Sequence, residues 1–524
     1  FGISKTGDLG YFGFSYKNSE SLFGIPFHGE GHEGHGGHEE EAHHDEDEHH
    51  EEEAHHEEGE HEGERIFSST ESDVFDIEGS YIVNNSWLKT INYFIRSSEY
   101  LHTEQHAEEE HGDEEMHHDE DENDEHGHEE GPTNFENKAK ELGFIFDLSN
   151  DFVEQKLSFN YAEEEISIIG AEAFMRPTDN EEFSLGYYLC KEFGLFDLDV
   201  GIRYDDISRK GSLAHHEDEH HDEDEHHDED EHHDEDEHHD EDEHHDEDEH
   251  EEEIEFYNRD FSQTSFAVNL SRELNDNFTL SLGLARVERA PSAVELFMNG
   301  AHLATGRLEV GNTNIESETS NNIDLNIYYQ NNNFSFKGNI FSNQIDNFIY
   351  LQDETEEEHE EHEEGHEEHA GLILSNYLQQ DAELDGYEIE FGNSMDIGSG
   401  ELTLSFGRDE TSGKFSSGGN IPRLNPARNI LKLKYAQDDM SLGINFKDVE
   451  KQNDIGTNET VTNAYQMLNV KLTKTFDFGN QGKLALSLFG NNMLDEAARN
   501  HASFVKNEVP LPGRNYGLRF NLEF

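Results

Sequence analysis

The residues with the most evident chemistry are histidines set in runs of acidic residues. Residues 220–250 repeat the unit HHDEDE five times and add one more His. Imidazole is a ligand for Zn, Cu, Ni and Fe, and carboxylates add hard oxygen ligands. The repeated His pairs therefore favour metal capture over a purely solubilising acidic segment. Calcium bound by carboxylates alone would leave the histidines without a role.

The spacing of the repeat indicates many weak sites instead of one rigid site. A period of six matches neither the helix nor the strand, and the unit has no apolar residue to bury, so we expect no fixed structure without metal. Because a protonated imidazole cannot bind metal, capture should weaken below about pH 6.5. The candidate ligands are His220, His221, His226, His227, His232, His233, His238, His239, His244 and His245.

Most of the charge lies in four inserts, which contain no Lys or Arg: residues 28–64, 102–131, 215–253 and 354–369. The chain of 524 residues carries a formal net charge of −90, with 124 acidic residues, 34 basic residues and 37 His. This balance repels nucleic acid and anionic surfaces and attracts cations. The single cysteine excludes an intrachain disulfide. The chain begins at Phe1, shows no signal peptide and is expected to be the C-terminal part of a longer protein.

The sequence between the inserts predicts β-strands. In the stretch LTLSFG, Leu402, Leu404 and Phe406 alternate with small or polar residues, and LKLKYA, SLGINFK and YGLRFNLEF show the same period of two. Such alternation is typical of strands with one apolar and one polar face. We count about eighteen strands, joined alternately by tight turns and by long loops that include all four inserts. Tight turns are predicted at residues 84–85, 274–277, 331–333, 398–400, 437–439 and 479–482.

The alternation of tight turns and long loops predicts an all-β fold. We expect a transmembrane antiparallel barrel over residues 1–524, with the inserts as loops. The apolar face would meet lipid and the polar face would line the lumen, and closure would satisfy every backbone group. The last strand ends in Phe524, as in outer-membrane barrel proteins, which puts the tight turns in the periplasm and the inserts outside the cell. A large soluble β-protein with inserted loops is the alternative fold.

Three segments resemble TonB-dependent outer-membrane receptors. Residues 284–320 have the sequence LARVERAPSAVELFMNGAHLATGRLEVGNTNIESETS, and residues 488–524 have the sequence LFGNNMLDEAARNHASFVKNEVPLPGRNYGLRFNLEF. The first is similar to a central stretch of these receptors, the second to their last hairpin, and residues 185–205 to an interior hairpin. Within the family, zinc-uptake receptors share the NGAHLATG loop, the HASF segment and loops rich in His, Asp and Glu.

The resemblance implies a barrel of 22 strands around an N-terminal plug, so a count of about eighteen implies that four strands, the plug and the TonB-contact segment are missing. It also implies an ordered metal site, for which the candidates are Glu295, His302, Glu309 and His501. A loop hydrogen bond stays open as the role of either His. Arg286 and Arg289 are expected to brace loops.

The sequence therefore predicts a receptor that captures transition-metal ions, zinc first, and passes them into the barrel. The alternatives are a receptor for a siderophore, haem or cobalamin, and a surface protein that buffers metal without transport. The expected partners are the TonB complex, outer-membrane lipid and divalent metal ions, with no nucleic acid, and the protein is expected to be a monomer. We find no catalytic nucleophile with its His and acid and no phosphate loop, so an enzyme is not expected.

Overall fold

The structure, a computed structural model, describes residues 1–25, 66–106, 131–170, 173–215, 253–355, 371–479 and 482–523. Most of each insert, the ten candidate His of the repeat and Phe524 lie outside the described residues. Strands make up most of the described chain. None of its helices is both long enough and apolar enough to cross a membrane.

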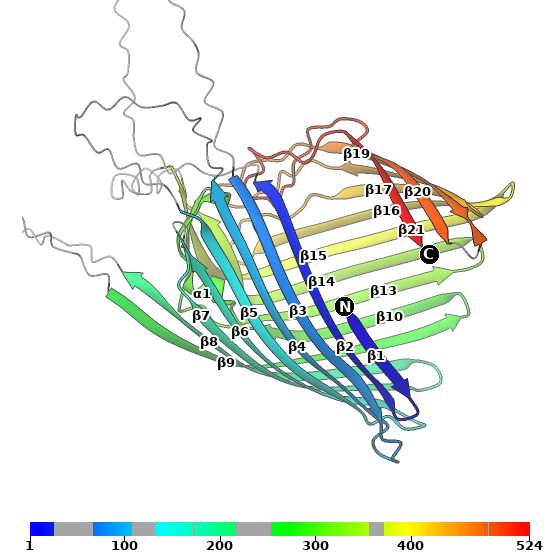
Figure 1. The fold of residues 1–524 in the computed structure, drawn as a ribbon, viewed down its shortest axis with the longest axis horizontal. Helices are drawn as coiled ribbons and strands as arrows, with labels where there is room; N and C mark the ends of the chain where they lie inside the picture. Colours follow the sequence, from blue (N-terminus) through cyan, green and yellow to red (C-terminus); the bar gives the residue numbers. More distant parts are fainter. Residues whose placement is uncertain are drawn as a thin grey trace, which may run out of the picture.

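Twenty-one strands form one sheet (Figure 1). Consecutive strands pair antiparallel from β1 to β10, then β10 pairs with β13, and pairing continues to β21. The elements are β1 (Gly2–Gly7), β2 (Gly10–Ile25), β3 (Ile66–Ile82), β4 (Thr90–His106), β5 (Thr133–Asp147), β6 (Glu154–Ile169), β7 (Thr178–Glu192), β8 (Asp197–His215), β9 (Glu253–Asn275), β10 (Phe278–Arg289), α1 (Ala293–Phe297), β11 (Asn299–His302), η1 (Leu303–Thr305), β12 (Arg307–Val310), β13 (Glu318–Gln330), β14 (Phe334–Asp353), β15 (Ile373–Ile397), β16 (Gly400–Phe415), β17 (Arg428–Gln437), β18 (Met440–Val449), β19 (Tyr465–Asp477), β20 (Lys483–Asn491) and β21 (Asn515–Glu523).

The wall of the sheet contains every strand except the short β11 and β12, which makes nineteen strands where the sequence predicted about eighteen. Within the described residues, β1 pairs only with β2 and β21 only with β20. The described sheet is therefore a curved, open wall, and closure of the ring is not seen.

The predicted alternation of tight turns and long loops is confirmed. Each of the six predicted turns lies between two paired strands, and all four inserts lie in long connections at the opposite end of the sheet. Asn84 and Gly398 have positive φ angles of 52° and 66°, a left-handed conformation that Asn and Gly adopt readily in turns.

The predicted insert boundaries were wrong in the second insert, because β4 continues to His106 and His102 is therefore a strand residue. The strands beside the repeat reach the bounds of the third insert, since β8 ends at His215 and β9 begins at Glu253. The end of β4, with the sequence HTEQH, is polar on both faces, so it lacks the apolar alternation from which strands are predicted.

The two faces of the wall differ in polarity, as predicted. One row of register partners on β16 to β19 is apolar, and the next row is polar. The apolar row is Leu404, Leu433, Ile444 and Val470, and the polar row is Ser405, Lys432, Asn445 and Asn469. A membrane barrel needs this alternation between a lipid-facing and a lumen-facing surface.

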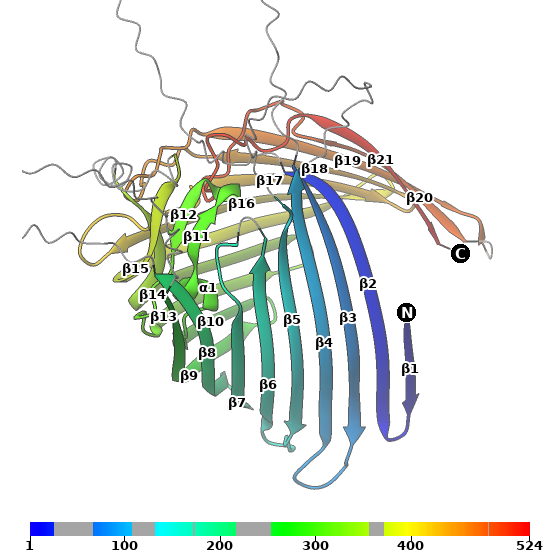
Figure 2. The ribbon, with the colours of Figure 1, turned by 60° about the vertical axis from the view of Figure 1, so that its left-hand side comes forward.

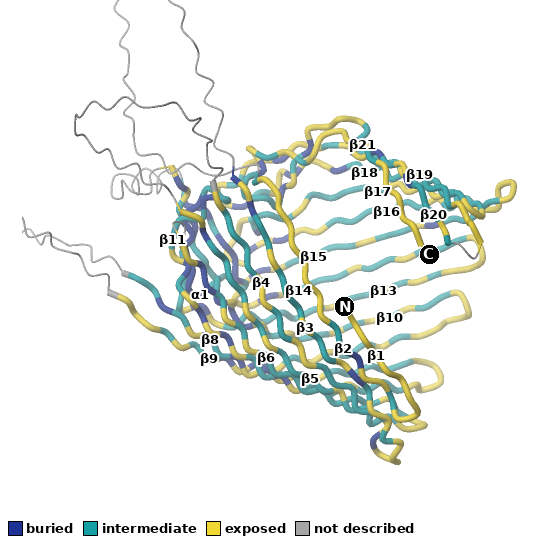
Figure 3. Tube along the Cα trace, viewed as in Figure 1, coloured by how far each residue is buried: buried dark blue, intermediate teal, exposed yellow. Residues whose placement is uncertain are grey.

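The connection from β10 to β13 folds back against the wall at the long-loop end and contains α1, β11 and β12 (Figure 2). Buried residues gather around α1 and β11 (Figure 3), and Leu296 and Phe297 of α1 are fully buried. A Cβ added at Gly211 of β8 would lie 2.6 Å from the Phe297 ring, so a glycine is needed for this close packing. The hairpin β11–β12 is then fixed to the wall by parallel pairing of β12 with β15.

Candidate functional site

Three histidines have described side chains, and each lies within 4 Å of a glutamate. Metal-binding His commonly uses one ring nitrogen for the metal and gives the other to a carboxylate. All three pairs therefore have the side-chain types that a transition metal selects. The pairs are His102–Glu104 at 2.9 Å, His302–Glu309 at 2.9 Å and His501–Glu459 at 3.7 Å.

The hairpin β11–β12 positions the second pair. His302 ends β11, and Glu309 lies in β12, where it is the register partner of Gly300. His302 Nδ1 lies 2.9 Å from Glu309 Oε1, and the Thr305 hydroxyl lies 2.9 Å from the same oxygen. The Phe174 ring stacks on the imidazole with 4.5 Å between centroids. The imidazole is therefore held in a fixed orientation.

Glu309 is buried beside His302. Its side chain is 4% exposed and that of His302 is 28% exposed. Among the described residues, no Lys or Arg forms an ion pair with Glu309. A buried carboxylate without a counter-charge is unfavourable, and a bound cation would supply that charge. If His302 donates Nδ1–H to Glu309, Nε2 carries the lone pair that a metal needs.

Glu295, also predicted as a ligand, has another set of partners. It closes a capping box at the start of α1, in which the Ser292 N–H donates to Oε2 over 2.7 Å. Arg289 Nη1 donates to both carboxylate oxygens over 3.1 and 2.9 Å and Nη2 to Glu318 over 3.2 Å. The structure does not join Glu295 to His302, and Arg289 braces this loop. No group of three or more potential metal ligands occurs within the described ranges.

His501, the fourth predicted residue, is fully enclosed, with a side-chain exposure of 0%. Its Nδ1 lies 2.8 Å from the Thr462 hydroxyl and 3.3 Å from Lys506 Nζ. An ammonium group only donates, so Nδ1 is the acceptor and the proton lies on Nε2. Nε2 is buried without a hydrogen-bond partner and faces Glu459 at 3.7 Å.

The charges around His501 respond to burial. Burial lowers the pKa of the Lys506 ammonium and of the Arg423 guanidinium below their ordinary values. Burial alone would raise the pKa of Glu459, but the interaction with His501 and the backbone N–H groups of Gly456 and Arg423 keep it below its ordinary value. Glu459 therefore remains a carboxylate at neutral pH.

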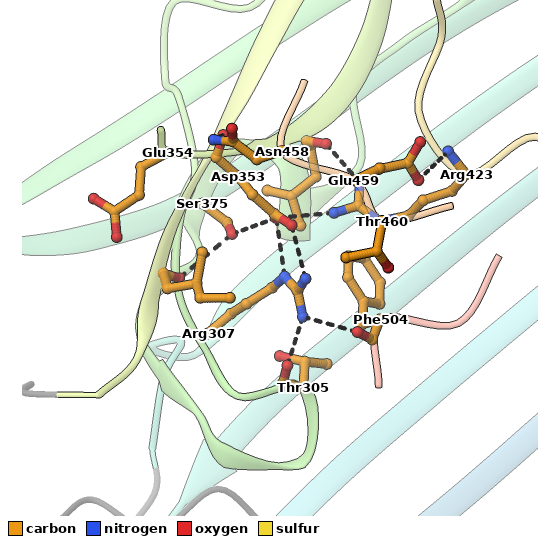
Figure 4. A network of polar contacts seen from close by, with 12 residues as sticks. Thr305, Arg307, Asp353, Glu354, Ser375, Arg423, Asn458, Glu459, Thr460 and Phe504 are labelled. Carbon is orange, nitrogen blue, oxygen red and sulfur yellow. Dashed lines mark hydrogen bonds and ion pairs between the residues drawn. The ribbon is translucent and has the colours of Figure 1, made fainter. Parts of the chain in front are cut away.

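A network of buried charges, which we call the loop clamp, joins several loops (Figure 4). Asp353 accepts hydrogen bonds from Arg307 Nε and Nη2 at 2.9 and 2.7 Å, from Arg423 at 2.9 Å and from Ser375 at 2.8 Å. The guanidinium groups of Arg307 and Arg423 lie 4.6 and 4.1 Å from the centre of the Phe504 ring. The clamp therefore consists of Arg307, Asp353, Ser375, Arg423 and Phe504.

The clamp fixes the hairpin of His302 relative to the last loop, which contains His501. Arg307 is the register partner of His302, and Phe504 lies three residues after His501. A cavity of about 320 Å³ lies beside the clamp and is lined in part by Thr305, Gly371 and Lys506. Sequence reasoning missed the clamp because its members lie far apart in the chain and belong to no motif.

Described ends of the inserts surround the same hairpin. Asn299 of β11 donates to the Ala214 carbonyl at the end of β8, over 3.2 Å. Residues 307–310 of β12 pair with the first residues of β15, which follow the fourth insert. Phe174, which stacks on His302, contacts Phe135 of β5, directly after the second insert. The hairpin is therefore the point where several inserts reach the described fold.

Known proteins share this fold. A family model described as TonB dependent receptor-like, beta-barrel, matches residues 56–493. The solved "Copper transporter OprC" is similar with a TM-score of 0.63 and 14% identity, over 99% of this chain and 78% of that one. The FrpB iron transporter from Neisseria meningitidis (F3-3 variant) is similar with a TM-score of 0.62 and 12% identity, over 100% of this chain and 71% of that one. The ferric-catecholate import receptor Fiu from K12 E. coli is similar with a TM-score of 0.57 and 13% identity, over 98% of this chain and 72% of that one.

Proposed function

The chain belongs to the family of TonB-dependent receptor β-barrels, and on this premise we propose that it takes up zinc through a site formed by His302 and Glu309. It is a protein of the Gram-negative outer membrane, and its general function is uptake of a metal or a siderophore. The identity of the cargo is the proposed part. Its strongest support is Glu309, a buried carboxylate that has a histidine but no Lys or Arg as partner in the described structure.

The first proposed step is capture by the inserts. Their histidines and carboxylates concentrate cations by charge and by weak, exchangeable ligation. The formal charge of −90 supports attraction of cations at the mouth of the barrel. The repeat histidines act here as a collecting surface, and specificity belongs to an ordered site.

The second proposed step is transfer to the His302–Glu309 pair. The described ends of the inserts adjoin the hairpin that carries this pair, so a captured ion has a short path to it. His501 and Glu295 support the site without contacting the ion, because His501 is enclosed and Glu295 is bound to Arg289 and to the start of α1. Release into the periplasm through movement driven by TonB follows from family membership alone.

A metal carried by an anionic chelator is the second candidate cargo. The cavity beside the clamp is lined by the cations Arg307, Arg423 and Lys506. Asp353 and Glu459, which also line the cavity, offset much of this positive charge, and Asp353 binds both arginines. The bare ion is therefore the better match to the site.

Growth under zinc limitation tests the proposal. Cells that depend on the full-length gene should grow more slowly with His302→Ala or Glu309→Gln, and added zinc should restore growth. Glu401→Gln is the matched control, because Glu401 is exposed at the tight-turn end of β16. Normal growth of both site variants, at equal amounts of protein in the outer membrane, would reject the pair as the cargo site.

A further inference from the structure

We infer that His102 and Glu104 form a second metal-binding station on the inner wall, beneath the first and second inserts. This inference rests on the proposed function, since it assumes that a transition-metal cation is the cargo. The station would receive ions from these two inserts and pass them to the His302–Glu309 pair. An ordered pair at His102 is not predicted from the sequence, because composition places His102 at the start of the second insert.

The backbone of β4 places the two side chains on one face. His102 and Glu104 are two residues apart in a strand, so they point to the same side. His102 Nε2 lies 2.9 Å from Glu104 Oε1. The Ser68 hydroxyl of β3 lies 3.1 Å from Nδ1 and 3.3 Å from Nε2, so it is close to both ring nitrogens. One imidazole, one carboxylate and one hydroxyl therefore converge.

Within the described ranges, no Lys or Arg neutralises the charge of this cluster. The side chains of His102 and Glu104 are 17% and 15% exposed, and Ser68 is fully buried. In the part of the chain that the structure describes, Glu104 forms its ion pair with His102 and with no Lys or Arg. The cluster shares this feature with Glu309, whereas Asp353 is neutralised by two arginines.

The cluster lies where two inserts meet the wall. The second insert follows His106, four residues after His102, and the described part of β3 begins at Ile66, two residues before Ser68. The hydrogen-bonded strand ends thus bring the end of the first insert and the start of the second insert together. Of the three described His side chains, His102 is the one on the strands that lead into these two inserts.

A short row of rings joins the two pairs along the inner surface. The ring centroids of His102 and Phe135 are 5.2 Å apart, those of Phe135 and Phe174 5.7 Å, and those of Phe174 and His302 4.5 Å. The rings contact both imidazoles. The two stations are therefore neighbours, separated by two phenylalanine side chains.

The ligand set points to exchange, not to permanent storage. An imidazole nitrogen and a carboxylate oxygen suit zinc and the other late first-row metals, and water would complete the shell. Two protein ligands hold an ion less firmly than the three or four of catalytic or structural zinc sites. An ion at this station can therefore leave for the next pair.

Zinc-edge anomalous diffraction from crystals of the full-length protein soaked in zinc chloride tests this station. We expect one peak about 2.0–2.2 Å from a His102 ring nitrogen and from Glu104, and a second peak at His302. Glu104→Gln should raise the zinc concentration needed for the first peak about 10–100-fold and leave the second unchanged. His102→Gln should abolish the first peak, and Glu99→Gln on the opposite face of β4 is the matched control.

The outcomes separate this inference from the proposed function. A peak at His302 without one at His102 would overturn the second station and leave the proposed cargo site intact. Peaks at neither pair would overturn both. A peak at His102 that survives both substitutions would also contradict the station, because the ion would then be held by other groups.

Discussion

At the scale of single residues, the buried carboxylates near the hairpin divide by their counter-charges. Asp353 binds two arginines, and Glu295 binds one arginine together with the start of α1. Glu309 and Glu104 have only histidine as a basic partner in the described residues. The first group therefore holds loops together, and the second group has the unbalanced charge that attracts a cation.

Removing the charge of Asp353 should release the loop clamp. Asp353→Asn leaves Arg307 and Arg423 partly or fully buried without their counter-ion, and breaking a buried pair costs on the order of 3–5 kcal/mol. We expect faster hydrogen exchange in β12 and in the loop between β16 and β17. Mass spectrometry of the exchanged protein measures this directly.

The control for this prediction is Asp396→Asn, because Asp396 is exposed near the other end of β15. This control should leave exchange in both loops unchanged. Equal exchange in the Asp353 variant and in the unaltered protein would show that the clamp does not hold the loops.

At the scale of elements, the hairpin is positioned by close backbone contacts. A Cβ at Gly311, just after β12, would lie 2.7 Å from the Leu296 carbonyl carbon and 2.8 Å from the Phe297 nitrogen. These are backbone atoms of α1, so no side-chain rotation can relieve the contact. The absence of a side chain at Gly311 therefore sets the distance between α1 and the strand that carries Glu309.

Gly311→Ala should move β12 away from α1 and separate Glu309 from His302. Overpacking of this kind costs about 1–3 kcal/mol, and zinc binding at the pair should weaken. Zinc-edge diffraction at the pair measures the effect. Gly443→Ala is the control, since its added Cβ would meet only the Lys471 carbonyl at 3.9 Å. Unchanged zinc occupancy in the Gly311 variant would contradict this account of the hairpin.

The sequence predicted the elements better than the contacts between them. Alternation at Leu402, Leu404 and Phe406 and turn residues such as Asn84 are local signals, and they predicted the strands and the parity of their connections. The contact of Arg307 with Asp353 links residues 46 positions apart, and no local pattern contains it. His102 was misplaced because its neighbours resemble the insert and not a strand.

At the scale of the whole molecule, charge and topology act together. The strands alternate in direction, so every insert leaves from the same end of the sheet. The four inserts contain 68 of the 124 acidic residues and 35 of the 37 His. Negative charge at this end of the barrel raises the local concentration of cations, and dissolved salt should screen this attraction.

A peptide of residues 214–253 should bind several zinc ions at neutral pH. Binding should decline below about pH 6.5, because protonated imidazole cannot act as a ligand. Isothermal calorimetry at two pH values measures both the number of ions and the decline. A peptide with every His replaced by Gln keeps the carboxylates and serves as the control. Equal zinc binding by the control peptide would assign capture to the acids alone.

The most direct test of the central claim is uptake of radioactive zinc by cells that carry the full-length gene. We expect saturable uptake at limiting zinc that requires TonB and falls about tenfold or more in Glu309→Gln, with uptake in Glu401→Gln unchanged. Uptake in Glu309→Gln equal to that of the unaltered protein, at equal amounts in the outer membrane, would contradict the claim that His302 and Glu309 hold the transported ion.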